Sequence, residues 1–284
     1  MTKIALVIAF NFLGNFLLMG QSRPTEYTDL ATAQQNPEAV ETLNLNEQGL
    51  TSFPEEILKF KNLTHLELAG NRIKALPEAL GTLTKLTYLD VSGNAIAELP
   101  DSFSALRSLR NLYVDYGDPE DLEHDFRVLA QLPSLSVLEV GGRGIKELPA
   151  AIGSLQSLET FELLNSQVEE LPAEFSELKK LRTLYIMNDE RFDFRKSIDV
   201  LRQLPDLSEL HLEGDNFTQL PSEISQLQSL EYLFLNNNAL QDLPTQINQL
   251  QNLKYLDVSN NKIPNYLLHR YQDDMLPTLR IKLN

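Results

Sequence analysis

The strongest constraint on the fold is a sequence unit that repeats along nearly the whole chain. Residues 63–83 read LTHLELAGNRIKALPEALGTL, and the next unit begins at residue 86 as LTYLDVSGNAIAELP. Both follow the template LxxLxLxxNxLxxLPxxIxxLxx. Self-similarity at a fixed period indicates stacked supersecondary units, and it takes precedence over any local reading of the sequence. Ten full units and one incomplete unit start at Val40, Leu63, Leu86, Leu109, Leu135, Leu158, Leu181, Leu207, Leu230, Leu253 and Leu276.

The two halves of the unit predict different local structures. Apolar residues alternate in LxxLxL, which is typical of a short strand whose leucines, such as Leu66 and Leu68, point to one side. The LPxxIxxL half has helical spacing, and proline suits the first turn of a short helix or 3-10 segment. One unit cannot bury its own leucines, but a stack of units can. The repeat therefore predicts one parallel sheet lining the inside of a curved stack.

These motifs resemble the leucine-rich-repeat family over residues 40–284. The LPxxI half is similar to that of many bacterial repeat proteins and of plant Ras-group intracellular repeat proteins. The resemblance implies an α/β solenoid, a horseshoe with a concave parallel β-sheet and short helices or 3-10 segments on its convex side. It also implies a binding function without catalysis.

The ends of the chain differ from the repeats. Residues 1–20 carry one charge, Lys3, and an apolar run that is short for a membrane span but fits a signal peptide. Cleavage after Gly20 would leave Gln21 first, and an uncleaved anchor is the alternative. We expect a linker and polar capping helix in 21–39, ten repeats in 40–275 and a capping strand in 276–284.

Two units, 109–134 and 181–206, are 26 residues long and lose the LPxxI half. Helical spacing of Val128, Leu129 and Leu132 predicts a longer convex helix in the first, and the second has the same pattern. Two interpretations stay open. The long units are either tolerated drift in a duplicated block or lateral projections that contact a partner or a second copy of the chain.

The asparagine of the template normally bonds backbone groups at the buried turn after the strand, where an unpaired group costs roughly 1–3 kcal/mol. Asn71, Asn94, Asn238 and Asn261 keep it. We therefore expect the central units to be softer, and the turn at Arg143 to open toward solvent, because a buried unpaired arginine is costly. The replacements are Gln48, Gly117, Arg143, Ser166, Asp189 and Asp215.

Composition excludes several classes of function. A net charge of −16 argues against nucleic-acid binding and against attraction to an anionic membrane. The chain has no Cys, so it has no disulfide, thiolate zinc site or cysteine nucleophile. No phosphate-binding glycine motif is present. We expect no catalytic, cofactor or metal site. His211 near Glu209 and Glu213 is the best enzyme or metal constellation, and ordinary neighbouring charges on a sheet explain it more simply.

Tyrosines and carboxylates alternate at the positions that face the concave side. Exposed aromatic side chains on a rigid sheet are typical binding anchors, and interleaved carboxylates favour a partner with Arg or Lys. Cross-strand pairs such as Tyr232 with Tyr255 that only stabilise the sheet are the alternative. The predicted partner-binding residues are Tyr88, Tyr113, Tyr116, Glu139, Glu162, Tyr185, Glu209, His211, Tyr232, Phe234, Tyr255 and Asp257, with Tyr116 at the rim.

The sequence thus predicts an exported, bacterial interaction module that binds a protein or peptide on its concave face. The location would be periplasmic, cell-surface or secreted, with no membrane contact after signal cleavage. Two alternatives remain: a cytoplasmic scaffold for a small GTPase or similar partner, and a carbohydrate or cell-surface adhesin.

Overall fold

A computed structural model describes residues 26–267, 271 and 279–283 of the 284-residue chain. The expected signal peptide in 1–20 and the start of the last unit at Leu276 lie outside the described residues.

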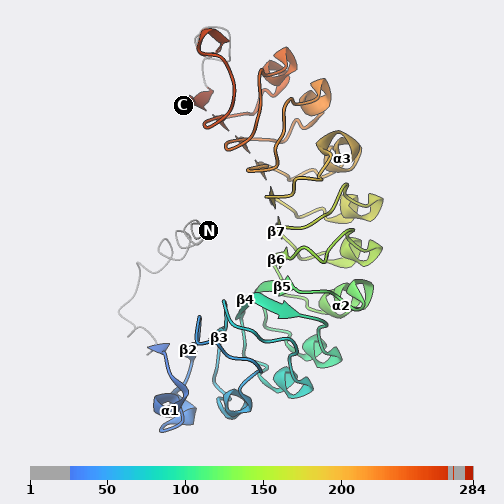
Figure 1. Cartoon of the computed structure of the whole chain (residues 1–284). Helices are drawn as coiled ribbons and strands as arrows, with labels where there is room; N and C mark the ends of the chain where they lie inside the picture. Colours follow the sequence, from blue (N-terminus) through green and yellow to red (C-terminus); the bar gives the residue numbers. More distant parts are fainter. Residues whose placement is uncertain (1–25, 268–270, 272–278, 284) are drawn as a thin grey trace, which may run out of the picture.

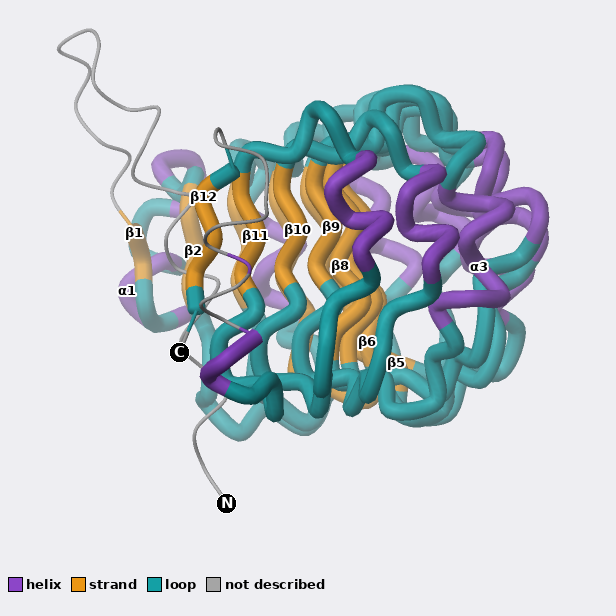
Figure 2. Tube along the Cα trace, turned by 90° about the horizontal axis from the view of Figure 1, so that it is seen from above, coloured by secondary structure: helices purple, strands orange, loops and turns teal. Residues whose placement is uncertain are grey.

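The described strands form one parallel sheet in which each strand pairs with its neighbours in sequence. Seen from above, β9 to β12 lie side by side in chain order (Figure 2). The strands are β1 Glu26–Tyr27, β2 Thr42–Asn44, β3 His65–Glu67, β4 Tyr88–Ile96, β5 Asn111–Tyr116, β6 Val137–Gly141, β7 Thr160–Leu164, β8 Thr183–Met187, β9 Glu209–His211, β10 Tyr232–Phe234, β11 Tyr255–Asp257 and β12 Arg280–Lys282.

The sheet lines the inside of an open horseshoe, and the short helices lie along its outer edge (Figure 1). Seven 3-10 segments follow a proline, as the LPxxI pattern predicts. The fixed φ of proline suits the start of a helical turn. The helices are α1 Leu30–Ala33, α2 Leu122–Leu129 and α3 Phe194–Leu201. The 3-10 segments are η2 Pro37–Ala39, η3 Glu55–Lys59, η4 Glu78–Thr82, η5 Asp101–Ala105, η6 Ala150–Ser154, η7 Ala173–Glu177, η8 Ser222–Gln226 and η9 Thr245–Gln249.

The template leucines form one continuous core between the sheet and the convex segments. Leu66 and Leu68, together with Leu80 from η4, have no exposed surface. Each such aliphatic side chain contributes roughly 1.5–3 kcal/mol when it leaves water. Because each unit shares its leucines with the next, burial continues from unit to unit and fixes the strand register.

The retained asparagines join neighbouring units. Nδ2 of Asn71 donates to the carbonyl oxygens of Leu45 (2.9 Å) and Leu68 (2.8 Å), while its Oδ1 accepts from the N–H of Leu50 (3.0 Å). Asn94, Asn238 and Asn261 make the same pattern one unit apart. The expected role of these residues is confirmed, and Arg143, which replaces one of them, is exposed as predicted.

Both long units carry the longer helix that their spacing predicts. Phe126 and Leu129 of α2 are buried, and so is Leu132, which follows the helix. Asp121 and Asp193 begin the two helices, and each carboxylate accepts a backbone N–H of the first turn, as preferred N-cap residues do.

The prediction that Tyr116 lies at the rim is wrong: only 2% of its surface is exposed. In most other units this position is a left-handed turn residue, such as Gly70 or Asn188, and β3 and β8 end before these two residues. In this unit the chain stays extended, so β5 runs on to Tyr116. Alternation along a strand then points Tyr116 inward, two residues after Val114. Its hydroxyl group lies beside the buried carboxyl of Asp125, and burial raises the Tyr116 pKa well above its ordinary value.

The last strand pairs in a register two residues away from the one expected. A constant 23-residue step places Arg280 beside Asp257, whereas in the structure Lys282 lies opposite Asp257 and Arg280 opposite Tyr255. A shift of two residues keeps every side chain on the same face, so the alternation pattern cannot distinguish the two registers. At the other end, a short strand, β1, precedes α1 and covers the edge of β2.

Among the described residues, no helix has both the length and the apolar character needed to cross a membrane.

Candidate binding surface on the concave face

Two columns of side chains cross the sheet on the face opposite the leucines. The strand register aligns them, so each column residue lies beside its counterparts on the neighbouring strands. Between β2 and β11 neither column contains Lys or Arg. The outer column is Thr42, His65, Tyr88, Asn111, Val137, Thr160, Thr183, Glu209, Tyr232, Tyr255 and Arg280. The inner column is Asn44, Glu67, Asp90, Tyr113, Glu139, Glu162, Tyr185, His211, Phe234, Asp257 and Lys282.

The C-terminal half of the face carries a continuous row of stacked rings. His211 lies between Tyr185 and Phe234, with ring centroids 4.0 Å and 4.1 Å away and interplanar angles of 20° and 6°. Tyr255 continues the row, 5.4 Å from Phe234. We call Tyr185, His211, Phe234 and Tyr255 the C-terminal aromatic row.

Two carboxylates hold the histidine of this row. Nε2 of His211 lies 2.9 Å from Oε1 of Glu209, and Nδ1 lies 3.2 Å from the Glu213 carboxylate. Burial lowers the pKa of His211, but the hydrogen bonds to Glu209 and Glu213 outweigh burial and raise it above the ordinary value. An imidazole ring held at both nitrogens and stacked on both faces suits a structural role. Both ring nitrogens of His211 therefore lie within hydrogen-bonding distance of a carboxylate of this chain.

A shorter row crosses the N-terminal half. His65 stacks on Tyr88 at 5.5 Å, and Tyr88 lies 5.3 Å from Tyr113 on the next strand. Burial and the surrounding carboxylates raise the pKa of Tyr113 to about 12, so its hydroxyl stays protonated and keeps its donor. We call His65, Tyr88 and Tyr113 the N-terminal aromatic row.

Two glutamates separate the rows. Glu139 pairs in register with Tyr113 on one side and Glu162 on the other, and Glu162 is followed by Tyr185. Burial, then repulsion from Glu162, raises the pKa of Glu139 to about 9, and burial raises the pKa of Glu162 to about 7. Among the described residues no cation contacts Glu139, whereas His211 attracts the Glu162 carboxylate from two strands away.

The remaining predicted residues vary in accessibility. Tyr232 is exposed (38%), and Tyr88, Tyr113, Tyr185, Phe234 and Tyr255 are half-buried. Asp257 is buried, and its two carboxyl oxygens accept hydrogen bonds from Ser259 (2.6 Å) and Lys282 (2.9 Å). The Asp257 carboxylate thus makes contacts within the fold, and its role in partner binding stays a prediction.

Sequence reasoning missed the two residues that complete this pattern. His65 is not among the predicted residues, although its column position beside Tyr88 favours a ring stack. Lys282 is not among them either, because the two-residue register shift at β12 hides its pairing with Asp257 from the repeat spacing.

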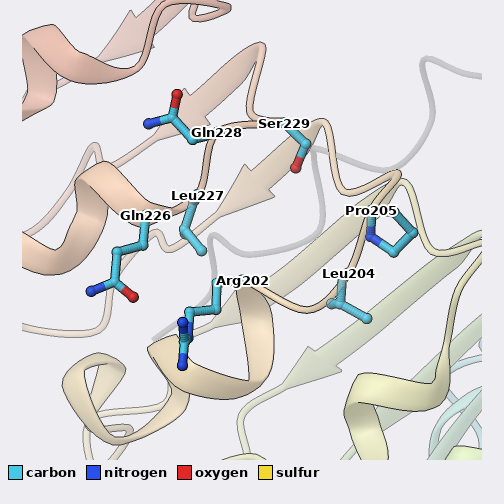
Figure 3. A pocket seen from close by; sticks show the side chains of 7 residues that line it. All are labelled: Arg202, Leu204, Pro205, Gln226, Leu227, Gln228 and Ser229. Atoms are coloured by element: carbon cyan, nitrogen blue, oxygen red, sulfur yellow. The ribbon is translucent and has the colours of Figure 1, made fainter.

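Away from the sheet, a cavity of about 340 Å³ lies between the end of α3 and η8 (Figure 3). Arg202 reaches it but pairs with Asp199 at 2.9 Å, and the other lining side chains carry no charge. This cavity offers no reactive group. Nor do the described residues contain a cluster of three or more His, Asp or Glu side chains able to hold a metal ion.

Several solved structures share this architecture. An internalin from Listeria monocytogenes has a TM-score of 0.56 at 19% identity, covering 87% of this chain and 76% of that one. The leucine-rich-repeat domain of the type III effector XopL has a TM-score of 0.55 at 22% identity, covering 90% and 79%.

A third structure is the ectodomain of the Arabidopsis thaliana membrane receptor kinase GASSHO1/SCHENGEN3, in complex with CASPARIAN STRIP INTEGRITY FACTOR 2. Its TM-score is 0.51 at 25% identity, covering 83% of this chain and 29% of that one.

Family models agree with the repeat pattern. The model described as leucine-rich repeat region matches residues 39–141 and 118–216, and the model described as leucine rich repeat matches 205–263. No curated protein sequence matches the chain. The matched segments span most of the repeat array, and the chain belongs to the leucine-rich-repeat family.

Proposed function

We propose that this protein is a non-enzymatic interaction module that binds a protein or peptide on its concave face, as part of an exported protein. Leucine-rich-repeat domains commonly bind proteins or peptides, and the plant receptor ectodomain is one solved in a complex. The observation that carries the proposal is the pair of aromatic rows. Rings fixed by stacking on a rigid sheet offer contact area at little entropic cost.

The alternative is that these rings only stabilise the sheet. At these stacking distances neighbouring rings do stabilise it, by roughly 0.5–1.5 kcal/mol a pair. Sheet stability, however, does not require so many rings on a face turned to solvent. Half-buried Tyr185 and Phe234, together with exposed Tyr232, leave apolar surface that a partner would cover.

The test is a crosslinking pull-down with the mature protein. Tyr185→Ala combined with Phe234→Ala is expected to lose most captured partner, because truncation removes two anchors while the leucine core stays intact. Tyr266→Ala is the matched control, since Tyr266 is 71% exposed and lies outside both columns. Equal capture by the double variant and the wild type would contradict binding at this face.

Export is proposed from the apolar N-terminal run alone. The expected outcome is a mature chain that begins at Gln21, found by mass spectrometry of cell fractions. A full-length chain confined to the cytoplasm would favour the scaffold alternative. A glycan array tests the carbohydrate-binding alternative. The proposed function predicts that no glycan on the array binds the protein.

A further inference from the structure

The centre of the concave face holds two carboxyl groups, of Glu139 and Glu162, that form no salt bridge among the described residues. Glu139 is only 4% exposed, yet no hydrogen bond to its carboxyl group is present among the described residues. A buried carboxylate is normally paired, because leaving it without a partner is costly. Neither carboxyl oxygen is fully enclosed, so the small opening that remains is at the charged end of the side chain.

The second carboxyl group lies on the adjacent strand. Glu139 and Glu162 are register partners on β6 and β7, and neighbouring strands lie about 4.8 Å apart. Like charges directly opposite each other destabilise a sheet. A fold under selection for stability alone would not place them together on its inner surface, whereas a binding site commonly carries such a cost.

Rings flank this pair on both sides. Tyr113 on β5 precedes Glu139, and Tyr185 on β8 follows Glu162, so the order across four strands is ring, carboxyl, carboxyl, ring. Both rings are held by neighbours, Tyr113 by Tyr88 and Tyr185 by His211. Their positions therefore do not depend on a ligand.

We propose that Glu139 and Glu162, flanked by Tyr113 and Tyr185, form the seat for an arginine side chain of the bound protein or peptide. This inference rests on the proposed function. A guanidinium group is planar, presents donors in a fixed fork and loses little hydration, so it can bridge two carboxylates and lie against a ring face. A lysine ammonium is a compact, strongly hydrated point charge and fits such a bridge less well.

The ionisation of the pair gives the proposal a distinctive signature. Several groups face the two glutamates: Asp90 and Asp115 on β4 and β5, Tyr113 and Tyr185, and His211 on β9. The acids and burial favour the protonated carboxyl group of Glu139, and only His211 acts in the opposite direction, on Glu162. A guanidinium group would displace protons from the pair. Binding should therefore strengthen as pH rises from about 6 to 9 and should release protons.

The experiment uses N-acetyl-arginine methylamide as the probe, with the lysine and citrulline analogues as comparison arms. Carbon-13 NMR of labelled carboxyl groups and tyrosine rings follows the titration in the full chain. We expect saturable shifts at Glu139, Glu162, Tyr113 and Tyr185 with the arginine probe, several-fold weaker binding of lysine, and no binding of citrulline, which is isosteric but neutral.

The variant arm is Glu139→Gln with Glu162→Gln, which keeps shape and removes charge. We expect at least about a tenfold loss of arginine-probe affinity and loss of its pH dependence. Glu67→Gln, in the same column but outside the seat, is the matched control and should bind within twofold of wild type. Thermal unfolding verifies that the double glutamine variant folds. If this variant does not fold, the chemical-shift changes of the wild-type protein with the three probes still decide the question.

Three results would overturn the seat: equal shifts with citrulline, shifts that avoid the two glutamates, or wild-type affinity in the double glutamine variant. The outcome is separable from that of the proposed function. If the glutamine variant still captures the partner while Tyr185→Ala with Phe234→Ala loses it, the face binds a partner and the arginine seat is wrong.

Discussion

At the scale of single residues, the template asparagine shows how one side chain can join two units. Its amide both donates to and accepts from the backbone. In unit eight Asp215 replaces the asparagine. Oδ1 of Asp215 accepts a hydrogen bond from the N–H of Asp189 at 2.8 Å. Oδ1 of the template asparagine Asn238 accepts from the N–H of Asp215 in the same way, at 3.1 Å. Oδ2 of Asp215 is buried without a hydrogen-bond partner, at the position where asparagine has a donor. A protonated carboxyl group would supply that donor.

Asp215→Asn should therefore stabilise the protein at alkaline pH. Burial and the neighbouring Asp189 raise the Asp215 pKa to about 8, above an unfolded value near 3.8. The folded state then binds the extra proton between these values, so stability falls as pH rises from about 4 to about 8. Above pH 8 the free energy of unfolding of the variant, measured with urea, should exceed that of the wild type by about 1–3 kcal/mol. Near pH 4 the two proteins should differ little.

Asp206→Asn, at an exposed position, controls for the change in net charge and should alter stability by less than about 0.5 kcal/mol. If Asp215→Asn proves no more stable at pH 9 than wild type, the carboxyl group does not replace the amide in this way. Some pH dependence should persist in the variant, because burial also raises the Asp189 pKa to about 7.

At the scale of elements, the first long unit departs from the template at the end of its strand. Gly142, after β6, has φ +121, and a Cβ there would lie 2.1 Å from the backbone oxygen of Tyr116. The strand extension that buries Tyr116 thus depends on the close approach of a glycine in the next unit.

Gly142→Ala should destabilise the protein by about 2–4 kcal/mol, because the new methyl group meets backbone and the φ value is strained. Gly49→Ala is the control, since Gly49 also has a positive φ (+69) but has nothing within 4 Å of a new Cβ. It should cost about 1 kcal/mol. Denaturant unfolding of both variants is the measurement, and equal losses would show that the contact with Tyr116 is unimportant.

Most elements could be predicted from sequence because the leucine alternation fixes the face that each strand buries. The strand pairs that align Tyr113, Glu139, Glu162 and Tyr185 follow directly from the unit spacing. Two features could not. A shift of two residues at β12 leaves the alternation unchanged, and the inward turn of Tyr116 depends on backbone conformation at one position.

The binding surface was predictable in a similar, partial way. Column membership follows from the repeat, so Tyr185, His211 and Phe234 could be placed on one face. The stacking of these rings and the hydrogen bonds of His211 to Glu209 and Glu213 depend on side-chain rotamers, which the sequence pattern does not predict. The burial of Asp257 likewise depends on Lys282, a residue from the last strand. The softness expected of the central units stays a prediction, which amide exchange would measure.

At the scale of the whole molecule, the sheet lines the inside of the curve (Figure 1), and the strand register places both columns on that inner side. Aromatic rows occupy both halves, acids lie between them, and the two columns from β2 to β11 lack Lys and Arg. If the proposed function holds, such a surface would speed the encounter with a basic partner, so partner association should slow as salt rises. The arrangement suits an extended or protruding segment lying across several strands.

Site-specific photocrosslinking tests this account most directly. A photoreactive phenylalanine analogue in place of Tyr232, on the concave face, is compared with one in place of Tyr266, which is more exposed but outside both columns. The account predicts that one partner protein or peptide is crosslinked from position 232 in the native setting, and that none is crosslinked from position 266. Crosslinking of the same partner from position 266 alone would contradict it.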